Sequence, residues 1–171
     1  MRKTALTLLV PALTAGGAHA GGIELTVEIP KLSVAEYHRP YVAIWIEDAS
    51  GKVAANLSVW YAVHLKDEEG EKWLKDIRQW WRRSGRALDL PADGLSSPTR
   101  PPGANKVEFK SDSGPLAKLA PGDYRLVVEA SREVGGKEMV EIPFKWAPGT
   151  EGTASASGKE ELGAVTLKLV K

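Results

Sequence analysis

Alternating apolar and polar residues predict several β-strands. In residues 23–29, Ile, Leu and Val occupy every second position and Glu or Thr lies between them, the period of a half-buried strand. Residues 41–47 and 57–65 are nearly continuous apolar runs on either side of Asp48-Ala49-Ser50-Gly51, which predicts a central hairpin. The remaining strand segments, separated by Gly- and Pro-bearing turns, are 106–109, 123–130, 138–145 and 162–170. About seven strands predict a mainly β protein, a β-sandwich.

One segment has a helical period instead. Between residues 69 and 83, Trp73, Ile77, Trp80 and Trp81 recur at helical spacing with charged residues on the other faces, so we expect one amphipathic, Trp-rich helix. Trp73, Ile77 and Trp80 share a stripe, whereas Trp81 lies about 100° round the helix from Trp80. The helix is either a lid over an open sheet edge or sandwich end, or an aromatic wall in which Trp81 stacks on a flat ligand.

The first twenty residues read as a secretory signal peptide. Arg2 and Lys3 precede a short apolar stretch, and Ala18-His19-Ala20 forms a small-residue cleavage site before Gly21. We therefore expect a signal at 1–20 and a single domain at 21–171, located in the periplasm. The chain has no cysteine, which excludes a lipoprotein anchor and disulfides, and no later stretch is apolar enough to predict insertion into a membrane.

Charge and residue content argue against several other functions. Removing Arg2 and Lys3 from the 23 basic residues, against 22 acidic ones, leaves a net charge of −1, so nothing favours nucleic acid as a partner. His38 and His64 are the only histidines after residue 20, and we expect them to be structural rather than metal ligands. No hydrolase-type serine motif is present, and we assign no catalytic residue. Residues 149–161 are rich in Gly, Ser, Ala and Thr and predict a mobile loop.

A short motif offers a threonine hydroxyl in a segment that we expect to be exposed and flexible. The sequence Asp93-Gly94-Leu95-Ser96-Ser97-Pro98-Thr99 resembles the acceptor motif of the bacterial FAD:protein FMN transferase, which esterifies FMN to a Thr or Ser hydroxyl. It departs from that motif at Ser97-Pro98, where the usual acceptor has Gly-Ala, and the alternative is an ordinary surface turn. The resemblance implies a phosphoester between FMN and Thr99, with Asp93, Gly94 and Ser96 as the recognised residues. We further expect Arg82, Arg83 or Arg100 to neutralise the phosphate, and Trp81 to stack on the ring.

Two longer resemblances add context. The stretch Thr99-Arg100-Pro101-Pro102-Gly103, continued to Asp123-Tyr124-Arg125-Leu126, resembles the immunoglobulin-like domain of the flagellar hook-capping protein, which implies an immunoglobulin-like sandwich. Nearly the whole chain after residue 20 resembles the predicted periplasmic family called domain of unknown function 2271, through residues 38–48, 72–77, 99–103 and 161–165. That family implies a periplasmic protein of Gram-negative bacteria, commonly encoded beside the FMN transferase and PepSY-type membrane proteins that resemble ferric reductases.

Two functions remain open at this point. The first is a non-catalytic electron carrier with covalent FMN on Thr99, loaded by the transferase and exchanging electrons with a PepSY-type membrane reductase in iron acquisition. A carrier of this kind needs a permanent tether, because a dissociating flavin would be lost from the periplasm by diffusion. The second is a flavin-free binding or structural immunoglobulin-like module that recognises a protein, haem or metal ligand.

Overall fold

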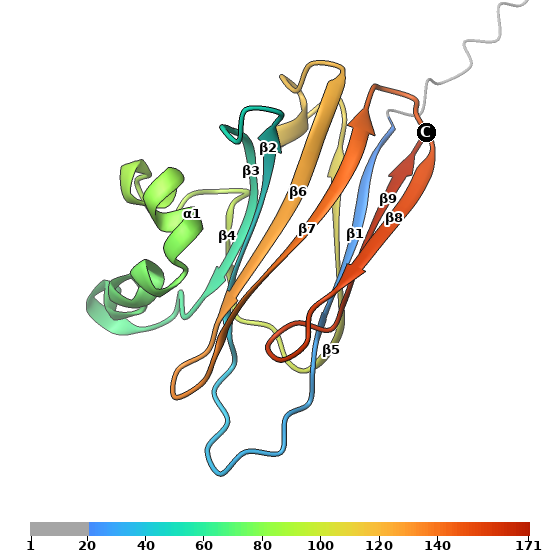
Figure 1. Cartoon of the computed structure of the whole chain (residues 1–171). Helices are drawn as coiled ribbons and strands as arrows, with labels where there is room; N and C mark the ends of the chain where they lie inside the picture. Colours follow the sequence, from blue (N-terminus) through green and yellow to red (C-terminus); the bar gives the residue numbers. More distant parts are fainter. Residues whose placement is uncertain (1–20) are drawn as a thin grey trace, which may run out of the picture.

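The computed structural model describes residues 21–171, so the predicted signal peptide at 1–20 lies outside the described part. Two β-sheets face each other as a sandwich (Figure 1). The four-stranded sheet has the order β5 (Gly103–Lys110), β1 (Gly22–Ile29), β9 (Ala164–Val170), β8 (Gly152–Ser157). The five-stranded sheet has the order β4 (Ser96–Pro98), β3 (Val53–Tyr61), β2 (Tyr41–Asp48), β6 (Gly122–Ser131), β7 (Lys137–Trp146). The predicted sandwich is confirmed with nine strands in residues 21–171 rather than about seven, and its immunoglobulin-like character stays a prediction.

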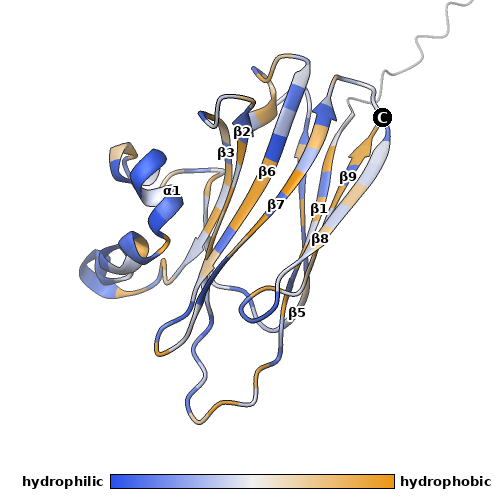
Figure 2. Cartoon of the chain, viewed as in Figure 1, coloured by the Kyte–Doolittle hydropathy of each residue, from blue (hydrophilic) through white to orange (hydrophobic). Residues whose placement is uncertain are grey.

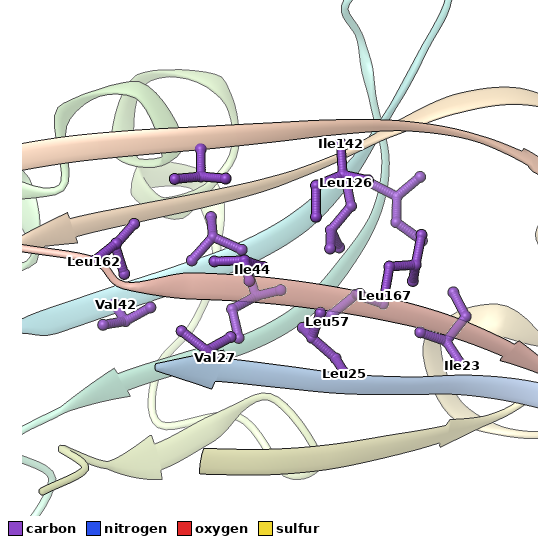
Figure 3. Packing of buried hydrophobic residues seen from close by; sticks show 14 of the residues in the cluster. Ile23, Leu25, Val27, Val42, Ile44, Leu57, Leu126, Ile142, Leu162 and Leu167 are labelled. Carbon is purple, nitrogen blue, oxygen red and sulfur yellow. The ribbon is translucent and has the colours of Figure 1, made fainter. Parts of the chain in front are cut away.

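The core lies between the two sheets and follows from the alternation of the strands. Ile23, Leu25 and Val27 of β1 point inward and interdigitate with residues of the opposite sheet such as Ile44 and Leu126 (Figure 3). The polar positions between them face solvent, where Glu24 pairs with Lys168 of β9 at 3.0 Å. One face of each strand is thus removed from water, which is the main stabilising contribution to the fold.

The predicted central hairpin is confirmed as β2 and β3. The Asp48 carboxylate accepts hydrogen bonds from the Ser50 and Lys52 amides at 2.9 and 3.1 Å, and Gly51 takes φ +80°, a conformation that glycine adopts without strain. However, β3 runs from Val53 to Tyr61 rather than from 57 to 65. Its first half carries Ala and Asn among apolar residues, so the pattern concealed it, whereas the apolar residues after Tyr61 belong to a turn.

The single amphipathic helix predicted over residues 69–83 is wrong. The structure has a 3₁₀ helix η1 (Lys66–Asp76), a short α1 (Arg78–Arg83) and a further 3₁₀ turn η2 (Gly85–Ala87). Ile77 separates the first two with ψ +76°, and Asp67 and Glu68 have positive φ. With this break Leu74, Ile77 and Trp80 are all buried, whereas Trp73 is half-exposed.

The helical segment covers the outer face of the five-stranded sheet rather than an edge or an end (Figure 1). Leu74, Ile77 and Trp80 pack on a second apolar cluster whose sheet members are Ala43, Trp45, Val59, Tyr61 and Val127. The opposite side of the segment is mostly hydrophilic (Figure 2). No helix within residues 21–171 combines the length and the apolar character that crossing a bilayer requires.

The mobile loop predicted for 149–161 is also wrong, since its middle, Gly152–Ser157, forms the edge strand β8. Ala154 and Ala156 pack against the core while Thr153, Ser155 and Ser157 face outward, and β8 pairs in antiparallel register with β9. The alternation is present in the sequence, but alanine and serine differ too little in hydropathy to reveal it. Backbone pairing with β9 therefore stabilises a strand that the hydropathy pattern alone does not indicate.

The packing at the start of the domain bears on where the signal peptide is cleaved. The Gly21 carbonyl accepts a hydrogen bond from the Ser111 amide at 2.7 Å, and a Cβ on Gly22 would overlap the Phe109 carbonyl oxygen. Residues at this end must therefore be small for packing, and the sequence before them fits a cleavage site. We expect the exported protein to begin at Gly21, as N-terminal sequencing would show, whereas retention of Met1 would contradict the signal peptide.

Candidate functional site

The residues of the predicted acceptor motif form a turn followed by a short edge strand. Asp93 and Gly94 are exposed, and Gly94 has φ +74° with open space where a Cβ would stand. Ser96 has a structural role, because its Oγ accepts a hydrogen bond from the Ala92 amide at 3.0 Å and the Ser96 amide donates to the Ala92 carbonyl at 2.9 Å. The turn is therefore closed from both of its ends.

The expectation of a flexible segment is wrong for residues 96–98. They form β4, which pairs in parallel with β3: Ser96 lies opposite Val59, Ser97 opposite Trp60 and Pro98 opposite Tyr61. Neither propensity nor alternation predicted this strand, and it exists because the edge of β3 offers backbone partners. Proline is compatible with this edge position, since its missing N–H removes no bond from a central ladder.

Thr99 follows directly after the edge strand and is half-buried. Its amide donates to the Tyr61 carbonyl at 3.2 Å, which fixes its backbone at the end of the sheet. Its hydroxyl takes part in no hydrogen bond within residues 21–171 and is not among the buried unpaired side-chain atoms. The hydroxyl therefore contributes little to the fold.

Arg100 is the residue after Thr99, and its guanidinium has no carboxylate partner in the described part. Its guanidinium stacks over the ring of the buried Trp60 with Cζ 5.4 Å from the ring centroid. Its Nε is buried without a hydrogen-bond partner within residues 21–171. A buried guanidinium N–H without an acceptor costs free energy, and an anion such as a phosphoester oxygen would satisfy it.

The helical tryptophans lie differently from the prediction. Trp80 is fully buried, as expected, but Trp73 is 51% exposed although it was assigned to the same buried stripe. Trp81 is half-buried against the second apolar cluster, with its ring 6.5 Å from that of Trp80. Leu95 of the acceptor segment packs against the same cluster, but no interaction joins Trp81 to Thr99 within residues 21–171. Stacking of Trp81 on a ligand stays a prediction.

Thr99 lies at one end of the sandwich, which we call the Thr99 end. The loops at this end are 30–40, 99–102, 132–136 and 158–163, because their flanking strands end in register there (Figure 1). A buried ion pair joins two of these loops: Arg132 Nε donates to Glu161 at 2.8 Å and Nη2 at 3.0 Å. His38 is also placed here, with Nε2 2.9 Å from Glu36 and Nδ1 3.5 Å from Glu133.

Glu138 holds loop 158–163 through an arrangement that the sequence did not reveal. Its carboxylate accepts hydrogen bonds from four consecutive amides, those of Lys159, Glu160, Glu161 and Leu162. Burial by itself would raise the pKa of Glu138, but the four N–H donors together outweigh it and the pKa lies below its ordinary value. The ionised carboxylate is therefore the form that stabilises the Thr99 end.

The lowered pKa of Glu138 predicts the pH dependence of stability. A depressed folded pKa contributes stability that is present above the unfolded carboxyl pKa, about 4.3, and is lost as pH falls through the folded value. We expect Glu138→Gln to lower the free energy of unfolding by about 1–3 kcal/mol at pH 7, because an amide cannot accept all four bonds. Denaturant titrations at pH 7 and at pH 3 would check this, and an equal loss at both values would contradict it.

Two buried glutamates under the helical segment also escaped the sequence analysis. Glu47 pairs with Arg83 of α1 and with Arg125 of β6, the latter at 3.0 Å. Glu129 accepts the Gln79 and Trp80 amides at 3.0 and 2.9 Å, and so satisfies the first turn of α1. The signal was a charged residue inside an otherwise apolar strand, which marks a buried polar group with partners on another element.

Comparison with known proteins identifies a family. The family model described as "Predicted periplasmic protein (DUF2271)" matches residues 22–164, which include β1 to β8, the helical segment and the loops of the Thr99 end. No curated protein and no solved structure matches the chain significantly.

Proposed function

Because the chain belongs to the DUF2271 family of predicted periplasmic proteins, we propose that it carries FMN covalently attached to Thr99 and transfers electrons outside the cytoplasm. The observation that supports this proposal best is that the Thr99 hydroxyl makes no hydrogen bond in the described part. Thr99 follows the edge strand β4, and the next residue, Arg100, has a buried Nε without a hydrogen-bond partner in the same part. A hydroxyl that the fold does not use is the group that a modifying enzyme needs.

The attachment reaction requires no catalytic residue of this chain. The Thr99 oxygen attacks the FMN-side phosphorus of FAD, the bond to the AMP phosphate breaks, AMP leaves, and the hydroxyl proton passes to a base of the Mg²⁺-dependent transferase. Asp93 and Gly94 are exposed for recognition. Because β4 has three residues and pairs with the sheet on one side only, opening it costs few hydrogen bonds.

Arg100 would then serve the product. The phosphodiester keeps one negative charge, and the buried Nε of Arg100 supplies a donor that has no partner within residues 21–171. With the cofactor retained in this way, the domain would pass electrons to or from a PepSY-type membrane protein, an arrangement suited to iron acquisition in the periplasm. The family description supplies the periplasmic location of this proposal.

Coexpression with the transferase tests the proposed function. We expect an exported chain isolated with the transferase to gain the mass of one FMN less water and to fluoresce in a denaturing gel, whereas a chain made without it shows neither. An unlabelled chain under both conditions would refute the flavin carrier. It would favour the second candidate, a flavin-free binding module, for which the departure at Ser97-Pro98 is the motivating observation.

A further inference from the structure

A pocket of about 220 Å³ opens at the Thr99 end, on the sheet face that the helical segment partly covers. It lies between the end of η1, the start of β2 and the β6–β7 hairpin. The lining residues that matter here are Arg39, Tyr41, Trp73, Arg132, Val134 and Lys137. Two aromatic rings, three cationic side chains and the carboxylates of Asp76 and Glu133 thus meet in one small cavity.

The apolar side of the pocket is unusually exposed. Trp73 is 51% and Val134 76% exposed, although both are large hydrophobic residues. Val134 also has φ +52°, which is rare and unfavourable for a β-branched residue. Strain of this kind persists where the surrounding structure imposes it and concentrates at ligand sites. The hairpin therefore holds Val134 out beside Trp73 at a cost, and a bound planar group would cover both.

The polar side of the pocket contains a rigid, incompletely used guanidinium. The Arg132 side chain is only 6% exposed and is fixed through Nε and Nη2 by Glu161. Its Nη1 is buried and has no hydrogen-bond partner within residues 21–171. Arg39 and Lys137 add positive charge, with Lys137 Nζ 3.4 Å from Asp76. The pocket therefore suits a flat ring with a hydrogen-bond acceptor that can face the unpaired Nη1 of Arg132.

Thr99 lies within tether distance of this pocket. Its amide bonds to the Tyr61 carbonyl, and the Tyr61 ring contacts Tyr41 of the pocket with centroids 6.2 Å apart. Thr99 and Tyr41 are thus two strand spacings apart, about 10 Å. The ribityl phosphate of FMN places eight bonds between threonine Oγ1 and the ring, roughly 9–10 Å at about 1.2 Å per bond in an extended chain.

We propose that this pocket binds the isoalloxazine ring of FMN carried by Thr99, with Trp73 as the stacking side chain in place of Trp81. The inference rests on the proposed function. The carbonyl-bearing edge of the ring faces the guanidinium of Arg132, and the apolar edge lies against Val134. Trp81 already packs against the second apolar cluster, whereas Trp73 is half-exposed and its ring is contacted only by the flexible Lys75, with Nζ 5.9 Å from the ring centroid, among the interactions of residues 21–171.

Flavin fluorescence of the transferase-loaded chain tests this inference, because stacking on tryptophan quenches a flavin. We expect Trp73→Ala to raise the fluorescence per attached flavin several-fold and Trp73→Phe to give an intermediate value. Trp81→Ala distinguishes the two stacking residues: with the ring on Trp73 the value stays unchanged in the folded protein, whereas with the ring on Trp81 it rises. Val134→Asp, at an exposed position that the core does not need, should also raise it by placing a carboxylate against the ring.

Intact mass measured on the same samples distinguishes a failure of the proposed function from a failure of the pocket. A wild-type chain that never gains FMN refutes the proposed function and this inference with it. A fully labelled chain in which Trp73→Ala and Val134→Asp fluoresce like the wild type, or in which only Trp81→Ala changes the signal, refutes the pocket and leaves the tether intact.

Discussion

Thr99→Ala is expected to abolish covalent FMN completely while the domain remains folded. The hydroxyl is the attacking group of the transfer, and alanine has no substitute for it. Because this hydroxyl makes no hydrogen bond within residues 21–171, its removal should change the free energy of unfolding by about 0.5 kcal/mol or less. Intact mass and gel fluorescence report the label, and a thermal melt reports the fold.

Thr99→Ser is the matched variant, since it keeps a hydroxyl at the same position, and it should retain part of the labelling. Full labelling of Thr99→Ala would move the attachment site to another residue. Ser97 would then be the next candidate, because the Ser96 hydroxyl already accepts the Ala92 amide. Loss of label together with loss of the folded state would show that the threonine is structural.

Trp80→Ala is expected to cause the largest loss of stability among the helical tryptophans, about 3–5 kcal/mol. The ring is fully buried in the second apolar cluster, and its Nε1 donates to Asn56 at 2.9 Å. Its backbone amide also donates to Glu129, and alanine keeps that N–H, so the loss reports the side chain alone. For a domain of this size the melting temperature should fall by about 6–20 °C, as calorimetry would show.

Trp73→Ala provides the comparison, because the same truncation at a half-exposed ring should cost no more than about 1 kcal/mol. Equal losses for the two variants would mean that both rings share one buried stripe, as the sequence had predicted, and that the broken helix is wrong. The comparison therefore tests the break at Ile77 as well as the role of each tryptophan.

Much of the sandwich was determined by the sequence alone. In β1, β6 and β7 strongly apolar residues alternate with charged ones, and a two-residue period leaves one choice of inward face. The turn at Asp48 could also be predicted, since its side chain closes the turn locally. Thr99 could likewise be proposed as an acceptor from sequence, because a modifying enzyme reads a short linear motif and not a fold.

Only the tertiary structure decided the elements whose residues carry a weak pattern. β4 and β8 consist of small or polar residues, and they are strands because an edge of an existing sheet lies beside them. The helix breaks at Ile77 because the curved face of the sheet and the carboxylate of Glu129 hold α1 in a direction that helical periodicity does not encode. That break buries Trp80 and exposes Trp73.

The pocket was likewise beyond the reach of the sequence. Arg39, Trp73 and Arg132 are far apart in the chain, and nothing in their local context connects them. They meet because the register of β2 with β6 brings Tyr41 beside Ser131, and because Glu161 of a third loop holds Arg132. Local physics thus determined the strongly patterned strands, whereas long-range pairing decided the weakly patterned ones and which side chains surround Thr99.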